Sequence, residues 1–91
     1  MSIEIFVVDN AHAAHEAGFR GGEHPANSDV KAWWPGMGAD RLRGRRFSRV
    51  VWALKHSPGT FSTHDIVALT IASEALRTRL DPGGVWIDLS R

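Results

Sequence analysis

The residues with the clearest chemical potential lie in one stretch, between a pair of adjacent tryptophans and an apolar run. The candidate partner-binding residues are Trp33, Trp34, Arg41, Arg43, Arg45 and Arg46. Arginine and tryptophan are enriched among the residues that dominate the binding energy of protein interfaces. The same arginines, together with Arg49, can neutralise phosphates while a tryptophan stacks on a base. The stretch therefore predicts a protein-binding surface, with a nucleic-acid or phosphate site and a solvated turn as the alternatives.

A second candidate site lies near the N-terminus, where histidines and acids have a spacing that suits metal ligation. His12, His15 and Glu16 would lie on adjacent turns of one helix, and Asp9 precedes them. Neutral imidazoles and carboxylates in such an arrangement can hold zinc or another divalent ion. Two histidines on a short exposed helix are more often polar surface residues, so we predict no metal site and no cofactor.

Motifs that carry phosphate or acyl chemistry are incomplete. Gly36-Met37-Gly38 supplies two glycines of a dinucleotide fingerprint, but Arg41 occupies the third position, where a side chain obstructs close packing of helix and strand. The chain has no G-K-[ST] sequence and no G-x-S-x-G elbow. It also has no cysteine, which excludes thiol nucleophiles and disulfides. We therefore predict that the protein is not an enzyme.

The elements that must position these residues follow from the apolar pattern. Strands are expected at Ile3–Val8, Asp29–Trp34, Phe47–Leu54 and Val85–Leu89. Helices are expected at Ala11–Phe19 and from an N-cap at Ser62 to Leu80. The run Phe47–Leu54 is the most apolar of the four strands, which favours the middle of the sheet. Trp33 and Trp34 point to opposite faces of a strand, so one of them lies under a helix or faces a partner.

Turn residues separate these elements and complete the fold prediction. We expect a loop over Gly21–Ser28, a turn at Asp81–Gly84 that ends the second helix, and a helical turn at Ala39–Arg43. The long second helix is sufficient for a crossover between two parallel strands. The predicted fold class is α/β, a small three- or four-stranded mostly parallel sheet with two helices packed on it. The alternative is a mixed sheet whose last strand is antiparallel at an edge.

Length, charge and composition limit the number of domains, the stability and the cellular location that we expect. A chain of 91 residues predicts a single domain over residues 1–91, modest stability, and a benefit from forming a homodimer. The formal charge of +1 gives no global attraction to nucleic acid or to an acidic membrane. No apolar run reaches the ~18 residues of a membrane span, and the beginning of the chain lacks the basic segment of an export signal. We therefore expect a cytoplasmic protein.

The segment from Leu42 to Ala53 carries two resemblances. It resembles the segment that enters the acid-bearing strand of P-loop ATPases of the phage terminase and helicase kind. The sequence Ala53-Leu54-Lys55 that follows has no acid to hold magnesium, so this resemblance implies no ATPase activity. The segment is also similar to parts of small uncharacterised accessory proteins of phages that infect actinobacteria. That resemblance implies a product that binds and redirects a bacterial host protein, and it assigns no functional residue.

Two functional hypotheses follow. The first is a non-enzymatic module that binds a protein partner, such as a bacterial host protein, through the tryptophan and arginine stretch. The second is a nucleic-acid or phosphate binder that uses the arginines from Arg41 to Arg49, whose affinity would fall steeply with added salt.

Overall fold

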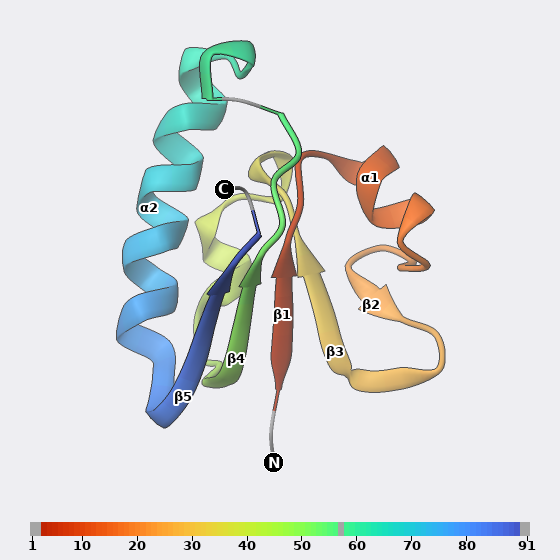
Figure 1. The fold of residues 1–91 in the computed structure, drawn as a ribbon, viewed down its shortest axis with the longest axis vertical. Coiled ribbons are helices and arrows are strands. Elements are labelled where there is room, and N and C mark those ends of the chain that lie inside the picture. Colours follow the sequence, from red (N-terminus) through yellow and green to blue (C-terminus); the bar gives the residue numbers. More distant parts are fainter. Residues whose placement is uncertain (1–2, 57, 90–91) are drawn as a thin grey trace.

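A computed structural model describes residues 3–56 and 58–89, and its elements form one sheet with a helix on each face (Figure 1). The strands are β1 (Glu4–Val7), β2 (Glu23–His24), β3 (Asn27–Trp33), β4 (Phe47–Trp52) and β5 (Leu80–Asp88). The helices are α1 (Ala11–Glu16) and α2 (Thr63–Arg79), with short 3-10 helices η1 (Pro35–Met37), η2 (Ala39–Leu42) and η3 (Pro58–Thr60). The predicted α/β class with two helices is confirmed.

The sheet is mixed, with the strand order β2-β3-β1-β4-β5. β1 pairs in parallel with both β3 and β4, and β5 pairs in parallel with β4, so the expected crossover through α2 is confirmed. Among the strands of the described residues, the one antiparallel pair joins β2 to β3 at the edge opposite the last strand. The prediction of three or four strands missed β2, and the middle strand is β1 instead of β4.

A tight turn at Gly21-Gly22 explains the missed strand. Arg20 and Glu23 exchange backbone hydrogen bonds of 2.7 and 3.0 Å across this turn. Both glycines have positive φ, 57° and 91°, which is the type I′ geometry that a Gly-Gly pair favours. A Cβ on Gly22 would lie 2.8 Å from the Met37 side chain. The expected loop over Gly21–Ser28 is therefore wrong, because the two glycines reverse the chain and leave β2 beside β3.

Helix α2 covers one face of the sheet and holds the main core. The Ser62 hydroxyl accepts a hydrogen bond of 3.1 Å from the Asp65 N–H, which confirms the predicted N-cap. Buried α2 residues recur at spacings of three and four, as expected for one helix face. The main core cluster contains Ile5, Val7, Trp33, Leu42, Phe47, Val50, Leu69, Ala72 and Leu76.

Strand β5 begins immediately after α2, so the expected turn at Asp81–Gly84 is wrong. Phe47 pairs with Leu80, and Arg49 pairs with Val85. The register shift between these two pairs accommodates Asp81–Gly84 within β5 itself. A bulge of this kind keeps the strand continuous where proline and glycine alone would indicate a turn.

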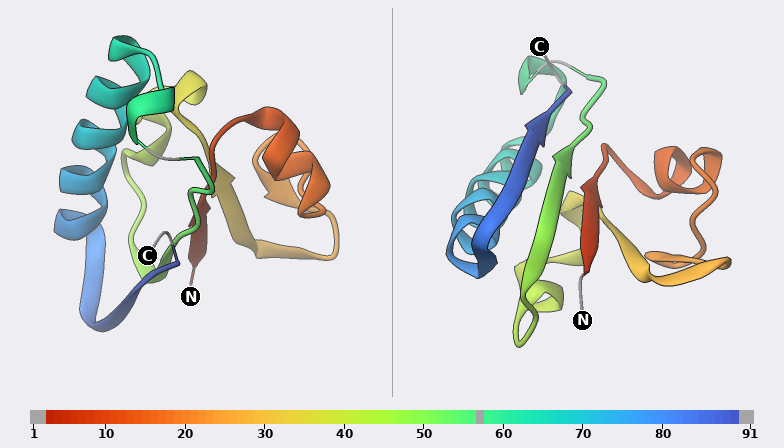
Figure 2. Two further views of the ribbon diagram at one scale, coloured as in Figure 1. Left: turned by 45° about the horizontal axis from the view of Figure 1, so that its top comes forward. Right: turned by 60° about the horizontal axis from the view of Figure 1, so that its bottom comes forward.

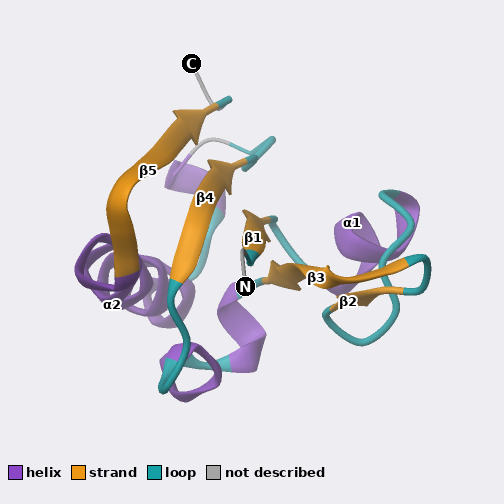
Figure 3. Ribbon diagram, turned by 90° about the horizontal axis from the view of Figure 1, so that it is seen from below, coloured by secondary structure: helices purple, strands orange, loops and turns teal. Residues whose placement is uncertain are grey.

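Helix α1 covers only part of the opposite face. The Asn10 side chain accepts a hydrogen bond of 2.8 Å from the Ala13 N–H and caps the helix, which ends at Glu16, before the expected Phe19. The second core cluster contains Val8, Ala14, Phe19 and Ala32. Figure 2 and Figure 3 show α1 near β3 and α2 on the other side of the sheet near β4 and β5.

The β4–β5 half of the α1 face is more open. Val85 and Leu89 of this region are 50% and 61% exposed, and Figure 3 shows α1 far from β5. Among the described residues, no helix has both the length and the apolar character that crossing a membrane requires.

Candidate functional site

The two adjacent tryptophans lie on opposite faces of the sheet, as the alternation of a strand requires. Trp33 is 1% exposed in the main core, and its indole N–H donates a hydrogen bond of 2.9 Å to the Gly38 carbonyl. Trp34 is half-buried against the second core cluster. The assignment of Trp33 to a partner-binding surface is therefore wrong, because its side chain is enclosed by the protein.

The four arginines of the predicted surface are all exposed but have different surroundings. Arg43 pairs with Asp40 at 3.3 Å, and Arg46 pairs with Asp81 at 2.9 Å. Arg41 and Arg45 instead line a small cavity on the α2 side of β3. The four arginines therefore do not form one continuous surface, since Arg41 and Arg45 share this cavity with the buried Trp33 while Arg43 and Arg46 pair with acids.

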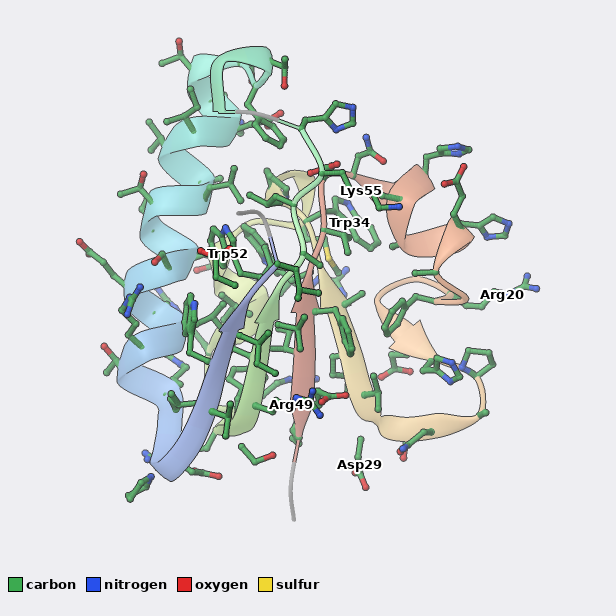
Figure 4. All side chains as sticks on the ribbon, viewed as in Figure 1. Arg20, Asp29, Trp34, Arg49, Trp52 and Lys55 are labelled. Atoms are coloured by element: carbon green, nitrogen blue, oxygen red, sulfur yellow. The ribbon has the colours of Figure 1, made fainter. Side chains whose placement is uncertain are left out.

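An apolar groove lies between α2 and the carboxyl end of β4, outside the residues predicted from the sequence to bind a partner. Its volume is about 420 Å³. The groove is lined by Trp52, Leu54, Phe61, Ile66, Leu69, Thr70, Ser73 and Glu74. Figure 4 shows Trp52 between the strands and α2, whereas Trp34 lies near α1. Most of the groove wall is apolar, and Glu74 contributes the charge at its rim.

Aromatic contacts support the wall of this groove. The Trp52 and Trp86 rings stack with centroids 5.7 Å apart. The Arg77 guanidinium of α2 lies 4.4 Å from the centre of the Trp86 ring, within the range of a cation–π interaction. Helix and sheet are thereby joined beside the groove, which favours a preformed shape.

Three large apolar residues of α2 are exposed, and one of them, Ile66, also lines the groove. Ile66, Val67 and Ile71 are 41%, 52% and 50% exposed. Val67 and Ile71 are one turn apart and therefore neighbours on the helix surface. We call these three residues together with the groove the α2 surface. Within the described part of the chain, the Glu74 carboxylate at its rim has no ion-pair partner.

A buried acid occupies the carboxyl edge of the parallel strands. Asp9, whose side chain is 1% exposed, follows β1, and the Lys55 N–H donates to its two oxygens at 3.0 and 3.2 Å. His56 Nδ1 lies 2.6 Å from Asp9 Oδ2, next to a cavity of about 230 Å³. The chain leaves β1 toward one face and β4 toward the other, and ligands of α/β sheets bind at such points. Through these contacts the Asp9 side chain orients the His56 ring and closes the turn after β4.

The fold does not place the residues of the metal and dinucleotide hypotheses in the arrangement that either kind of site requires. His12 Nε2 lies 2.7 Å from Glu16 Oε1 on α1. Across residues 3–56 and 58–89, no group of three histidine or acidic side chains is arranged to hold a metal ion. Gly36 and Gly38 lie around η1 after β3, a 3-10 helix of three residues instead of the longer helix that follows a dinucleotide-binding loop.

Comparisons with known proteins assign the chain to no family. No family model matches the chain, and no curated protein or solved structure matches it significantly.

The width of the apolar face of helix α2 is the sequence feature that could have indicated the α2 surface. The apolar positions of this helix include Ile66, Val67 and Ile71. Only Leu69, Ala72 and Leu76 of the helix are buried, so the apolar face is wider than the core it covers. An apolar stripe wider than the sheet can cover is the signal that could have indicated a binding surface.

Proposed function

We propose that the protein is a non-enzymatic α/β module that binds a protein partner through the α2 surface. The observation that carries this proposal is the exposure of Ile66, Val67 and Ile71 on the helix that forms one wall of an apolar groove of about 420 Å³. Scattered exposed apolar side chains are common on proteins, whereas exposed apolar residues on a helix that also forms the wall of an apolar groove favour an interaction site.

The free energy available from such docking is substantial. Complete burial of a valine or isoleucine side chain contributes ~1.5–3 kcal/mol, and each of these side chains has about half of its surface still in water. Trp52 and Phe61 in the groove wall belong to the aromatic type that is enriched at interface centres. Removing water from this region would therefore favour association.

The shape and charge of the α2 surface favour a partner that presents an amphipathic helix with a basic residue. An amphipathic helix can place apolar side chains at spacings of three and four into a groove of this kind. The Glu74 carboxylate at the rim favours a lysine or arginine beside those apolar anchors. The resemblance of Leu42–Ala53 to phage accessory proteins directs the search for this helix to proteins of a bacterial host.

The test compares two double variants with matched exposure. The first is Val67→Ser with Ile71→Ser, on the α2 surface. The control is Val85→Ser with Leu89→Ser on the opposite face, whose side chains are 50% and 61% exposed. Tagged proteins are used to capture partners from nuclease-treated bacterial lysate, and circular dichroism confirms the fold of each. We expect the α2 variant to lose, and the control to retain, a specific partner.

The same assay also tests the surface first predicted from the sequence against the α2 surface. A third variant, Trp34→Ala with Arg43→Ala, alters that surface and leaves the α2 surface intact. Loss of the partner in this variant alone would contradict docking on α2, and equal retention by all three variants would exclude both surfaces. Capture that disappears with nuclease treatment would favour nucleic-acid binding instead.

A further inference from the structure

A small cavity on the α2 side of β3 gathers basic side chains that are far apart in the sequence. Its volume is about 110 Å³, equal to roughly three or four water molecules at ~30 Å³ each. One wall is the Gly21-Gly22 turn, and the opposite wall comes from the crossover between β3 and β4. The charged residues that line it are Glu23, Lys31, Arg41 and Arg45. Three cations and one carboxylate leave a formal local charge of +2.

Lys31 is held in place at this cavity. Its side chain is only 15% exposed, and its Nζ lies 2.7 Å from Glu23 Oε1. The hydrogen bond and positive charge of Lys31 lower the pKa of Glu23, and the charge of Arg45 lowers it further. The charge of Arg45 therefore reaches the Lys31–Glu23 pair. Lys31 is thus a fixed ammonium group whose position does not depend on a ligand.

Arg41 and Arg45 differ from the other arginines of the crossover. Arg43 and Arg46 each pair with an aspartate, whereas the guanidinium groups of Arg41 and Arg45 have no hydrogen-bonded or ion-paired partner among the described residues. A guanidinium presents five donors in a planar fork that matches phosphate oxygens. Two such unpaired groups beside one cavity provide the donors that a multiply charged oxyanion requires.

The local backbone allows the two walls to approach each other. Gly22 has φ +91°, and a Cβ there would lie 2.8 Å from Met37 Cε and 3.2 Å from the Ala32 carbonyl oxygen. Glycine is therefore needed where the tight turn meets the crossover. This close approach brings Lys31 on β3 and the arginines after η1 to the same cavity.

We propose that this cavity binds the phosphate group of a small phosphomonoester, with Lys31, Arg41 and Arg45 as its ligands. A tetrahedral group of five heavy atoms suits the cavity volume, and its double negative charge would balance the formal charge of +2. Bidentate arginine contacts are among the strongest hydrogen bonds to phosphate. Trp33, which also lines the cavity, is 1% exposed in the core and offers no free ring for stacking a base. The site therefore favours a terminal phosphate over a nucleic-acid strand.

The test titrates the protein separately with inorganic phosphate, with phenyl phosphate and with a single-stranded oligonucleotide that has no terminal phosphate. Binding is followed by amide NMR shifts at constant ionic strength. The variant Arg41→Gln with Arg45→Gln should weaken binding at least about tenfold, because it removes the unpaired donors. The control Arg43→Gln with Arg46→Gln removes the same charge outside the cavity and should change affinity less than about twofold. Glu23→Gln should tighten binding roughly two- to fivefold, because it removes the competing carboxylate.

The outcomes separate phosphate binding in this cavity from general charge attraction and from nucleic-acid binding. Saturable shifts at Gly21 and Gly22 that are lost only in the Arg41 and Arg45 variant support the proposal. Absence of saturation, or equal weakening in both arginine variants, would overturn it in favour of general charge attraction. Binding only to a single-stranded oligonucleotide without a terminal phosphate would overturn it in favour of a nucleic-acid site. None of these results depends on the α2 surface, which lies outside this cavity.

Discussion

The two faces of the sheet are covered by helices of very different length. The α2 face is covered by a helix of 17 residues and by the η1–η2 crossover, and it contains the larger core cluster. The opposite face has a helix of six residues, which buries Ala14 and leaves Val85 and Leu89 largely in water. A helix of six residues spans only ~9 Å and cannot cover five strands. The longer helix therefore goes with the larger core cluster.

The better-covered face is also the one that offers candidate sites. The long helix has more apolar residues than the sheet can bury, so Ile66, Val67 and Ile71 remain exposed. The crossover on the same face brings Arg41 and Arg45 to the cavity beside Lys31. The core and the two candidate sites therefore use different sides of the same helix and crossover.

The largest expected effect is the difference in stability loss when the tryptophan on each face is replaced by alanine. Trp33→Ala should lower the free energy of unfolding by ~3–5 kcal/mol, because it opens a cavity in the main core. That is a large part of the roughly 5–14 kcal/mol expected for a domain of this size. Trp34→Ala, on the α1 face, should cost only ~1–2 kcal/mol since its side chain is half-buried. Urea unfolding followed by circular dichroism measures both, and equal losses would contradict the difference between the faces.

A smaller effect is expected when the N-cap residue of each helix is replaced by alanine. Ser62→Ala should lower the free energy of unfolding by ~1 kcal/mol, because α2 packs on the main core and its loss is felt globally. Asn10→Ala removes the equivalent cap from α1. We expect it mainly to accelerate amide hydrogen exchange within α1, because so short a helix can open locally. Hydrogen exchange together with urea unfolding tests this, and a larger global loss for Asn10→Ala would show that α1 stabilises the fold more than α2.

The smallest effect concerns the ion pair on the α2 face. The Lys31 hydrogen bond and charge hold the pKa of Glu23 below its ordinary value of 4.5. The stabilisation from ionised Glu23 is therefore complete above that value and is lost as the pH falls through the lowered folded pKa. Glu23→Gln should reduce the melting temperature slightly at pH 7 and leave it unchanged at a pH below both values. A difference between the two proteins that persists at low pH would contradict this origin.

Local sequence signals predicted individual elements better than their arrangement. The Ser62 cap, the buried run of β4 and the opposite directions of Trp33 and Trp34 were all predicted, because each depends on neighbouring residues. Strand β2 was missed because two residues give no periodicity. The bulge after Leu80 was missed because proline and glycine indicate a turn unless a partner strand continues the pairing.

The candidate sites show the same limit. Residue types indicated that tryptophan and arginine near Trp33 to Arg46 could bind a partner, and the sequence cannot tell which of these side chains the core encloses. The crossover separated Arg41 and Arg45 from Arg43 and Arg46, and it joined the first pair to Lys31, ten residues or more away in the chain.

The sequence by itself determined the α/β class, the position of the long helix, its N-cap and the absence of thiol chemistry. These features follow from side-chain type and from periodicity within a single segment. Only the tertiary structure decided which apolar residues of α2 remain exposed and which cations share a cavity. Both depend on the pairing of strands distant in the chain, because the order of the strands fixes how much surface each helix can cover.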